Sequence, residues 1–296
     1  MKFLFILNPS AGKGQGRNLL SPLVKKLQKI GFSADLILPR HPDEALAKAR
    51  NAQDKGCDFL VACGGDGTVH SLLPALVNRP TILGLLPMGT ANDLARNWNI
   101  PFNLNRAVAL LTAGRSKTVD IIATHAGVFI AGAAGLGLDA AVVKRASEWR
   151  KYGKGFVPFL LATWVEFLKF RPPRVSITAG NWHYHGPAWQ VLFTNIRRYA
   201  RWIKTTPCGK LDDGLMEICL IPGIPKSHLL TLFPLFLSRG FREIPGTRLL
   251  STTEGVIESF PPLTFQGDGE LIGKTPVAFR VIPNALKVMM PPPTEV

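Results

Sequence analysis

Residues 59–68 read FLVACGGDGT, an apolar run that passes directly into a glycine-rich turn. The apolar run predicts a buried strand, and residues 69–77, which follow, predict a helix. A turn at this place presents the backbone amides of a helix N-terminus, which bind anions, and its glycines let phosphate oxygens approach closely. We therefore predict a phosphate-binding turn made of Gly64, Gly65, Asp66, Gly67 and Thr68.

Asp66 adds negative charge where a polyphosphate would bind. An intervening Mg²⁺, bound directly or through water, would reconcile the two, because this ion prefers carboxylate and phosphate oxygens. Asp66 could instead serve only as a cap in a glycine-rich turn. The residue is thus a candidate catalytic group, with capping as the alternative.

A second turn, residues 87–93 (PMGTAND), also lies between an apolar run and a helical pattern. Thr90 could donate to phosphate or cap the helix. Asn92 and Asp93 could order a ribose, a metal-bound water or the facing loop. In a parallel sheet both turns emerge at the carboxyl edge, where ligands bind, so we expect them to form one site.

A third turn, residues 8–14 (NPSAGKG), follows the first apolar run. It resembles part of a P-loop but lacks the GKS or GKT ending and the spacing. Lys13 could neutralise a phosphate, or could be an ordinary exposed lysine.

Strand and helix patterns alternate in the first part of the chain. Apolar runs typical of strands occupy residues 2–7, 32–38, 59–63 and 81–86, and helical patterns occupy residues 18–30 and 42–56. This alternation predicts an α/β N-terminal domain with a mostly parallel sheet, over residues 1–120.

From about residue 117 short strand patterns dominate. They cover residues 118–122, 127–131, 175–179, 188–194 and 215–221, with helical patterns only at 138–152 and 156–170. We expect an all-β, antiparallel, sandwich-like C-terminal domain over residues 121–296. The last strand could return to the N-terminal domain.

The composition indicates a folded protein of a reducing compartment. The chain of 296 residues is 46% hydrophobic and 19% charged, which permits a substantial core. Its cysteines (Cys57, Cys63, Cys208 and Cys219) form no CxxC pair, as expected in the cytoplasm. The apolar start ends at Asn8, short of a signal-peptide core, and no segment reaches the roughly 18 uncharged apolar residues of a membrane span.

The three turns, in this order and spacing, resemble the diacylglycerol kinase catalytic-domain family, in its soluble bacterial lipid kinase branch. The matching motifs are NP-x-AG, GGDGT and P-x-GT-x-ND-x-AR. Residues 212–216 (DDGLM), 268–270 (DGE) and 281–288 also match, so the resemblance spans nearly the whole chain. GGDGT alone is shared with NAD kinases and phosphofructokinases. The resemblance, which extends to sphingosine kinases, implies an NAD kinase-like fold.

The resemblance implies that ATP and Mg²⁺ are the cofactors. The positions that would line the nucleotide site are Asn8, Pro9, Ser10, Ala11, Gly12, Gly64, Gly65, Asp66, Gly67, Thr68, Val69, His70, Ser71, Gly89, Thr90, Asn92 and Asp93.

Residues 268–270 would supply the general base, as the resemblance implies. A carboxylate suits this role, because phosphoryl transfer needs positioning, charge neutralisation and late removal of a proton. Alternate residues of an extended segment point to the same side, so Asp268 and Glu270 could both face the site. We favour Glu270 as the base for its longer reach, with Asp268 in a metal network. An acidic hairpin turn is the alternative.

The resemblance also implies a second Mg²⁺, away from the chemistry. Its ligands would be the Asp213 carboxylate and the backbone carbonyls of Lys210 and Leu215, oxygen ligands that suit a hard cation. A plain Asp-Gly hairpin turn is the alternative.

Departures from the family pattern bear on the substrate. His70 and Ser71 stand where the family commonly has Asn and Glu, and we expect His70 to be a helix-surface residue. Pro39 stands where relatives often have a nucleotide-contacting threonine. Residues 195–202 (NIRRYARW) replace a glycine-rich stretch near the expected acceptor entrance.

The net charge of +15 predicts an anionic partner. Residues 197–202 interleave cations with aromatics, and the apolar run 229–237 is followed by Arg239 and Arg242. Such segments suit a lipid substrate at an anionic membrane surface, with core packing as the alternative. No recognition motif accompanies the charge, so we expect no specific nucleic acid. A homodimer is left open.

We therefore expect a cytoplasmic, peripherally membrane-associated lipid kinase. It would use ATP and Mg²⁺ to phosphorylate a lipid hydroxyl, such as that of diacylglycerol, in a cleft between the two domains. An NAD kinase-like enzyme shares GGDGT, and a catalytically silent lipid- or nucleotide-binding module would fit the altered Ser71 and the altered residues 197–202. The later DGE segment and the membrane-like surface favour the lipid.

Overall fold

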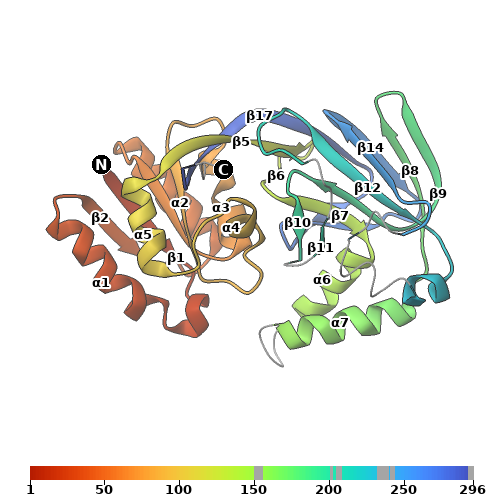
Figure 1. Cartoon of the computed structure of the whole chain (residues 1–296), viewed down its shortest axis with the longest axis horizontal. Helices are drawn as coiled ribbons and strands as arrows, with labels where there is room; N and C mark the ends of the chain where they lie inside the picture. The colour runs from red at the N-terminus through yellow and green to blue at the C-terminus, as the bar shows by residue number, and fades with distance from the viewer. Residues whose placement is uncertain (150–155, 201–202, 205–208, 232–239, 241–243, 293–296) are drawn as a thin grey trace. The chain divides into compact units, whose positions relative to one another are not determined.

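Strand β3 (Phe59–Gly64), which the glycine-rich turn follows, lies inside a parallel sheet (Figure 1). It pairs on one side with β1 (Lys2–Leu7) and on the other with β4 (Ile82–Pro87). Strand β2 (Ser33–Ile37) pairs with the far side of β1. The order is therefore β2-β1-β3-β4, and the chain reverses its direction of travel across the sheet between β1 and β3.

The computed structural model describes residues 1–149, 156–200, 203–204, 209–231, 240 and 244–292. The chain divides into two units, each with its own core. Unit 1 comprises Met1–Ile121 and Asn284–Val296, and unit 2 comprises Ile122–Pro283.

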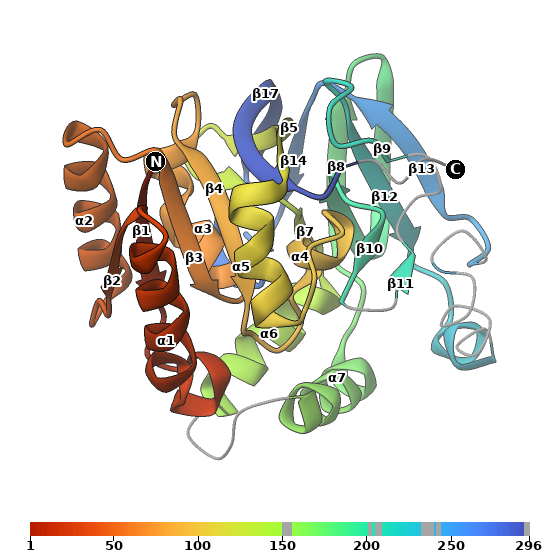
Figure 2. The same ribbon diagram turned by 60° about the vertical axis from the view of Figure 1, so that its left-hand side comes forward.

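Helices cover both faces of the unit 1 sheet (Figure 2). They are the short η1 (Ala11–Gly14), α1 (Gly16–Lys29), α2 (Pro42–Asp54), α3 (Asp66–Leu76), α4 (Asp93–Asn97) and α5 (Leu104–Ala113). Leu20 of α1 and Leu111 of α5 share one hydrophobic core with Phe5 of β1, so these two helices lie on the same face. Helices α2 and α3 pack together on the opposite face.

Unit 2 is built mainly from antiparallel strands. They are β6 (Phe129–Ile130), β7 (Ala133–Gly137), β8 (Arg174–Ala179), β9 (Trp182–Thr194), β10 (Arg198–Tyr199), β11 (Ile203–Lys204), β12 (Met216–Pro222), β13 (Arg248–Thr252), β14 (Glu254–Ser259), β15 (Thr264–Gly267) and β16 (Glu270–Lys274). Helices α6 (Leu138–Trp149) and α7 (Phe156–Lys169) pack against each other.

Strand β9 belongs to both layers of this sandwich. Its first half pairs with β8, and its second half, from Ala188, pairs with β12 and β7. The core lies between the layers, where Phe193 stacks on Phe279 with 4.2 Å between ring centroids. Strands β5 (Arg115–Thr124) and β17 (Val277–Met290) run through both units.

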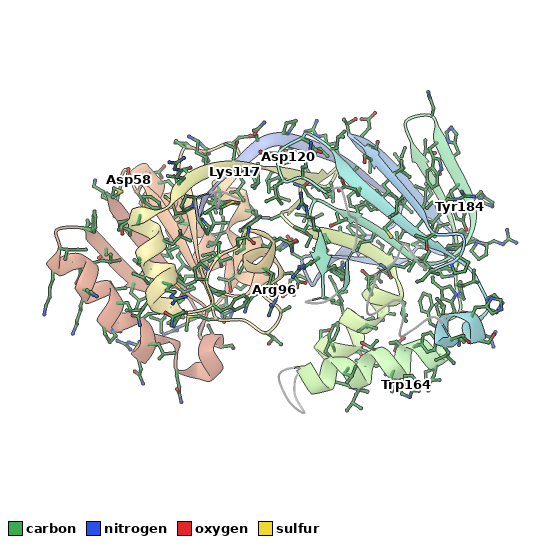
Figure 3. All side chains as sticks on the ribbon, in the orientation of Figure 1. Asp58, Arg96, Lys117, Asp120, Trp164 and Tyr184 are labelled. Carbon is green, nitrogen blue, oxygen red and sulfur yellow. The ribbon has the colours of Figure 1, made fainter. Side chains whose placement is uncertain are left out.

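Strand β17 enters unit 1 at Asn284, which has a φ of 52°. The N–H of Asn284 donates to the buried carboxylate of Asp120 at 2.7 Å, and the Thr118 hydroxyl donates to the Asn284 side chain at 2.7 Å. Asp120 is labelled in Figure 3. Beyond this point Val288 pairs in parallel with Leu83 of β4. Residues 284–290 thus complete the edge of the parallel sheet.

The fold class predicted from the sequence is confirmed. A mostly parallel α/β sheet forms unit 1, and an antiparallel β-sandwich forms unit 2. The helix predicted over 138–152 is described as far as Trp149.

Candidate functional site

The three predicted turns of unit 1 are hydrogen-bonded to one another. Gly12 N–H donates to the Met88 carbonyl at 3.2 Å, and Met88 N–H donates to the Gly64 carbonyl at 2.9 Å. The Asn8 amide donates to the Thr68 hydroxyl at 3.3 Å. The turns after β1 and β3 flank the point where the strand order reverses, which is where open α/β sheets bind ligands.

The turn after β3 and the turn after β4 touch through the backbones of their glycines. A Cβ placed on Gly89 would overlap the Cα of Gly65 and would lie 2.8 Å from the Asn92 side-chain oxygen. A Cβ on Gly64 would overlap the Thr68 hydroxyl. Glycine is required here because no side chain fits between the turns, and this close approach gathers their amides at the sheet edge.

Asp66 caps a helix, but not its own. It is the first residue of α3, and its two carboxylate oxygens accept the N–H groups of Asp93 and Leu94, each at 3.0 Å. Both amides belong to the first turn of α4, where a carboxylate is favoured by the helix dipole. The capping alternative is therefore confirmed in kind, although the helix that Asp66 caps is α4 and not α3. The metal role of Asp66 stays a prediction.

Asn92 closes its own turn. Its side-chain oxygen accepts the Gly89 N–H and its amide donates to the Gly89 carbonyl, both at 2.9 Å, while its φ is 53°. The side chain is 5% exposed and is engaged within its own turn, and its role at a ribose, a metal-bound water or the facing loop stays a prediction. The N-cap of α4 is Asn92, so the exposed Thr90 does not cap the helix.

The remaining predicted nucleotide residues differ in exposure. Asn8, Pro9, Ser10, Gly89 and Thr90 are exposed, Gly12, Gly65, Asp66, Gly67, His70, Ser71 and Asp93 are half-buried, and Ala11, Gly64, Thr68 and Val69 are buried. Since Val69 lies wholly in the core, only its backbone can reach a ligand. The Ser71 hydroxyl donates to the Thr68 carbonyl at 2.9 Å, a bond that stabilises the first turn of α3.

Asp268 lies in a tight turn of unit 2. Asp268 and Gly269 join β15 to β16, with φ of 50° and 85° as in a type I′ turn. The Asp268 carboxylate accepts three consecutive N–H groups, from Ala131 (2.9 Å), Gly132 (2.8 Å) and Ala133 (3.2 Å). The expectation that an extended segment turns Asp268 and Glu270 to one side is corrected, because Asp268 lies in this turn and its oxygens hold residues 131–133. The metal network at Asp268 stays a prediction.

Glu270 begins β16 and is half-buried. The turn before it is fastened on its other side, because Gly269 N–H donates to the Gln266 side-chain oxygen at 3.0 Å. Asp268 and Gln266 together therefore define the backbone position from which the Glu270 side chain starts.

Gln266 connects this turn to a buried polar cluster that the sequence analysis missed. Its amide donates to the Asp139 carboxylate at 2.9 Å and contacts the Tyr199 hydroxyl at 3.0 Å. Asp139 is at the start of α6 and also accepts the Ala140 N–H at 2.6 Å. Burial raises the pKa of Asp139, and hydrogen bonds, first from Gln190 and then from Gln266, oppose the rise. A lone aspartate at a helix start is an ordinary cap, so the pattern gave no signal.

The proposed second metal loop has a further acidic neighbour. Asp213 is exposed and accepts the Leu215 N–H at 3.2 Å. Glu217 is 5% exposed, and its Oε2 has no hydrogen-bond partner among the described residues. Burial, and then the charge of Asp213, raise the pKa of Glu217 to about 7. Two adjacent carboxylates, one with an unsatisfied oxygen, fit a hard cation such as Mg²⁺.

The described residues contain no metal cluster and no membrane-spanning helix, and some predicted features lie outside those residues. Within the described part of the chain, no three His, Cys, Asp or Glu side chains gather as a metal cluster. Nor does any helix in the described ranges have the length and apolarity to cross a membrane. Cys208, Arg201, Trp202, Arg242, residues 232–239 and the Lys13 side chain lie outside the described residues.

A parallel sheet with interlocked glycine turns at its reversal point, followed by an antiparallel sandwich, defines a two-domain α/β protein of the NAD kinase-like class. The model of the diacylglycerol kinase catalytic domain matches residues 2–124, and that of the YegS C-terminal NAD kinase beta sandwich-like domain matches residues 132–290. The chain belongs to the family of kinases that these two domains define.

Relatives match over nearly the whole chain. A "Probable lipid kinase YegS-like" of Pectobacterium atrosepticum is 26% identical, covering 98% of this chain and 96% of the relative. A "Diacylglycerol kinase" of Staphylococcus aureus is 28% identical, covering 97% and 91%. The crystal structure of a diacylglycerol kinase from Bacillus anthracis shares the fold, with a TM-score of 0.80, 22% identity and coverage of 100% and 98%.

Proposed function

We propose that the protein is an ATP- and Mg²⁺-dependent kinase of a lipid hydroxyl, such as that of diacylglycerol. The observation that carries the proposal is the interlocking of three turns at the reversal point of the parallel sheet. The relatives named lipid kinase and diacylglycerol kinase support the choice of a lipid acceptor.

The nucleotide would bind to unit 1. Backbone N–H groups of residues 64–68, at the N-terminus of α3, would donate hydrogen bonds to its phosphates, and the exposed Asn8, Ser10 and Thr90 would line the same edge. Asp66, with Asp93 beside it, would hold Mg²⁺, which would neutralise charge on the phosphates when bound.

Glu270 of unit 2 would act as the general base. The acceptor hydroxyl would lose its proton to the Glu270 carboxylate while its oxygen bonds to the γ-phosphorus, and the bond from that phosphorus to the bridging oxygen of ADP would break. Asp268 and Gln266 would contribute by positioning the turn that carries the base.

A second Mg²⁺ would bind at the Lys210–Leu215 loop. The Asp213 carboxylate and the carbonyls of Lys210 and Leu215 are its proposed ligands, and the unsatisfied oxygen of Glu217 adds acidic character. The role would be to stabilise unit 2. We further propose that the protein is cytoplasmic and associates peripherally with anionic membrane, without binding a specific nucleic acid.

The test is transfer of labelled γ-phosphate from ATP to a total lipid extract, with chromatographic separation of the products. A labelled lipid band that requires Mg²⁺ and disappears in Glu270→Gln supports the proposal. Labelled NADP from added NAD, with no lipid band, would establish the NAD kinase-like alternative. Binding of Mg-ATP without any transfer would establish a silent binding module.

A further inference from the structure

Helix α7 presents a stripe of large apolar side chains to solvent. Leu160, Leu161, Trp164 and Leu168 are each 53–55% exposed. Three of them are four residues apart in sequence, which places them above one another on one side of a helix. Trp164 is marked on this helix in Figure 3. Contiguous exposed apolar side chains on a soluble surface indicate an interaction site.

The other side of α7 is anchored in unit 2. Ala162 is completely buried, and Glu166 forms a salt bridge with Arg145 of α6. Phe167 stacks on Trp189 of β9, with 5.7 Å between ring centroids, and Trp164 stacks on Phe167 at 6.2 Å. The helix therefore has a defined inward face, and the stripe (Leu160, Leu161, Trp164 and Leu168) is its outward face.

Cations gather at the C-terminal end of α7. Lys169, Arg171 and Arg174 are exposed. The Lys226 ammonium donates to the Leu168 carbonyl at 2.7 Å and lies 5.9 Å from the centre of the Trp189 ring. The one acidic residue of the helix, Glu166, is engaged by Arg145. The basic end of the helix therefore complements an anionic surface.

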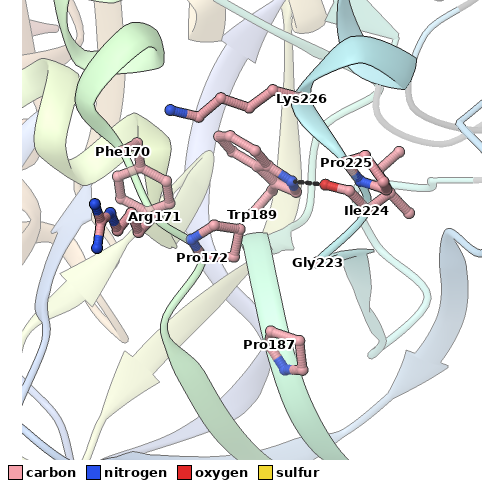
Figure 4. Close-up of a pocket in the computed structure, with 9 residues that line it drawn as sticks. All are labelled: Phe170, Arg171, Pro172, Pro187, Trp189, Gly223, Ile224, Pro225 and Lys226. Atoms are coloured by element: carbon pink, nitrogen blue, oxygen red, sulfur yellow. Dashed lines mark hydrogen bonds between the residues drawn. The ribbon is translucent and has the colours of Figure 1, made fainter.

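A shallow cavity of about 390 Å³ opens at this basic end (Figure 4). Its wall combines apolar rings, those of Phe170, Pro172 and Trp189, with the cations of Arg171 and Lys226. Such a wall suits a ligand with a phosphate beside hydrocarbon, as in a phospholipid headgroup region.

We propose that α7 is the membrane-docking helix of this protein. The stripe inserts into the interface of an anionic bilayer, and Arg171 and Lys226 contact lipid phosphates at the level of the headgroups. A second copy of the chain fits this face poorly, because a two-fold interface would bring the same cations against one another. The inference rests on the proposed lipid acceptor only for its biological purpose, since docking is measurable without catalysis.

The test is sedimentation of the full chain with vesicles, in the absence of nucleotide. The anionic vesicles contain phosphatidylcholine with about 30% phosphatidylglycerol, and neutral vesicles of pure phosphatidylcholine test the effect of charge. The protein should bind the anionic vesicles and should bind the neutral vesicles far less. The double variant Trp164→Gln, Leu168→Gln should bind the anionic vesicles at least about tenfold more weakly. Arg171→Gln should reduce the preference for anionic vesicles. Phe260→Gln, at an apolar residue 93% exposed elsewhere in unit 2, is the matched control and should bind as the wild type.

Three outcomes would overturn the proposal. Equal binding of the double variant and the wild type would exclude the stripe, and loss of binding in Phe260→Gln would mean that any exposed apolar residue serves. A halving of the molecular mass in the double variant, by light scattering, would make α7 a dimer interface.

The docking inference and the proposed function can fail separately. Phosphorylation of a short-chain acceptor in detergent micelles does not require docking, so the double variant should retain it. If the wild type phosphorylates a lipid and the double variant binds vesicles as well as the wild type does, the docking proposal fails and the proposed function stands. Stripe-dependent vesicle binding without phosphorylation of any lipid would contradict the function alone.

Discussion

The carboxylate of Asp66 accepts the N–H of Leu94 at 3.0 Å, so the first residue of α3 caps α4. This bond, with its counterpart to Asp93, joins the turn after β3 to the turn after β4. Because the two turns also touch at Gly65 and Gly89, they form one rigid edge. A phosphate bound to one turn would therefore be positioned relative to the other.

We expect Asp66→Ala to abolish turnover, because the substitution removes both the cap and the proposed metal ligand. Loss of a helix cap costs about 1–2 kcal/mol of stability, so the variant should fold with a modestly lower melting temperature. In Asp66→Asn, the Mg²⁺ concentration needed for half-maximal activity should rise. Asp43→Asn, in the exposed first turn of α2, is the control. Near-normal activity of Asp66→Ala would contradict the assignment.

Glu270→Gln should lower kcat by about 10²–10⁴-fold, as expected for loss of a general base. The affinity for ATP should be unchanged, since the proposed nucleotide residues lie in unit 1. Steady-state kinetics with a fixed lipid acceptor, and ATP binding by calorimetry, separate the two effects. Equal losses in both would make Glu270 a binding residue.

Asp268→Asn should act on stability. Its carboxylate accepts three N–H groups, and an amide would turn one oxygen into a donor that faces them. The free energy of unfolding should fall by about 1–3 kcal/mol. Denaturant titration measures this change, with Glu270→Gln as the comparison that should unfold like the wild type. An unaltered denaturation midpoint for Asp268→Asn would show that the three hydrogen bonds of its carboxylate do not stabilise the fold.

Asp139→Asn should change how stability depends on pH. Burial raises the pKa of Asp139 above its ordinary 3.8, so the folded state binds the proton more tightly than the unfolded state. The carboxyl therefore lowers stability progressively as pH rises above about 4. Melting temperatures of the wild type should fall relative to those of Asp139→Asn between pH 4 and pH 8. A difference that is constant over this range would refute the assignment.

Mg²⁺ should raise the melting temperature of the wild type through the loop at Asp213. Saturation a hundredfold above Kd would stabilise the folded state by about 2.7 kcal/mol. Asp213→Asn should lose this response, whereas Asp212→Asn should keep it. If Mg²⁺ leaves the melting temperature of the wild type unchanged, the proposed metal site at Asp213 is contradicted.

The parallel half of the fold could be predicted from the sequence because its signals are local. Each apolar run, such as residues 59–63, leads into its turn and helix within a few positions, and the parallel register then brings the turns to one edge. The partner of Asp66 could not be predicted in this way. It lies 27 residues away and depends on how β3 and β4 align.

The polar cluster of unit 2 was beyond the sequence patterns for a similar reason. Asp139 and Gln266 are 127 positions apart and meet only because β15 pairs with β7. The stripe on α7 was hidden by composition, since the helix is apolar around most of its circumference. The side of α7 that faces solvent is set by its packing on α6 and Trp189, and the spacing of apolar residues in the sequence does not indicate these partners.

Strand β17 has a consequence for how the protein is made. Residues 284–290 complete the parallel sheet that begins at Lys2, and Val288 covers the side of β4 at Leu83. During translation, β4 keeps an open edge at Leu83 until all of unit 2, Ile122–Pro283, has been synthesised. Folding of unit 1 thereby depends on residues that are made only after the whole of unit 2, and a stop codon within β17 would deprive both units of strand residues.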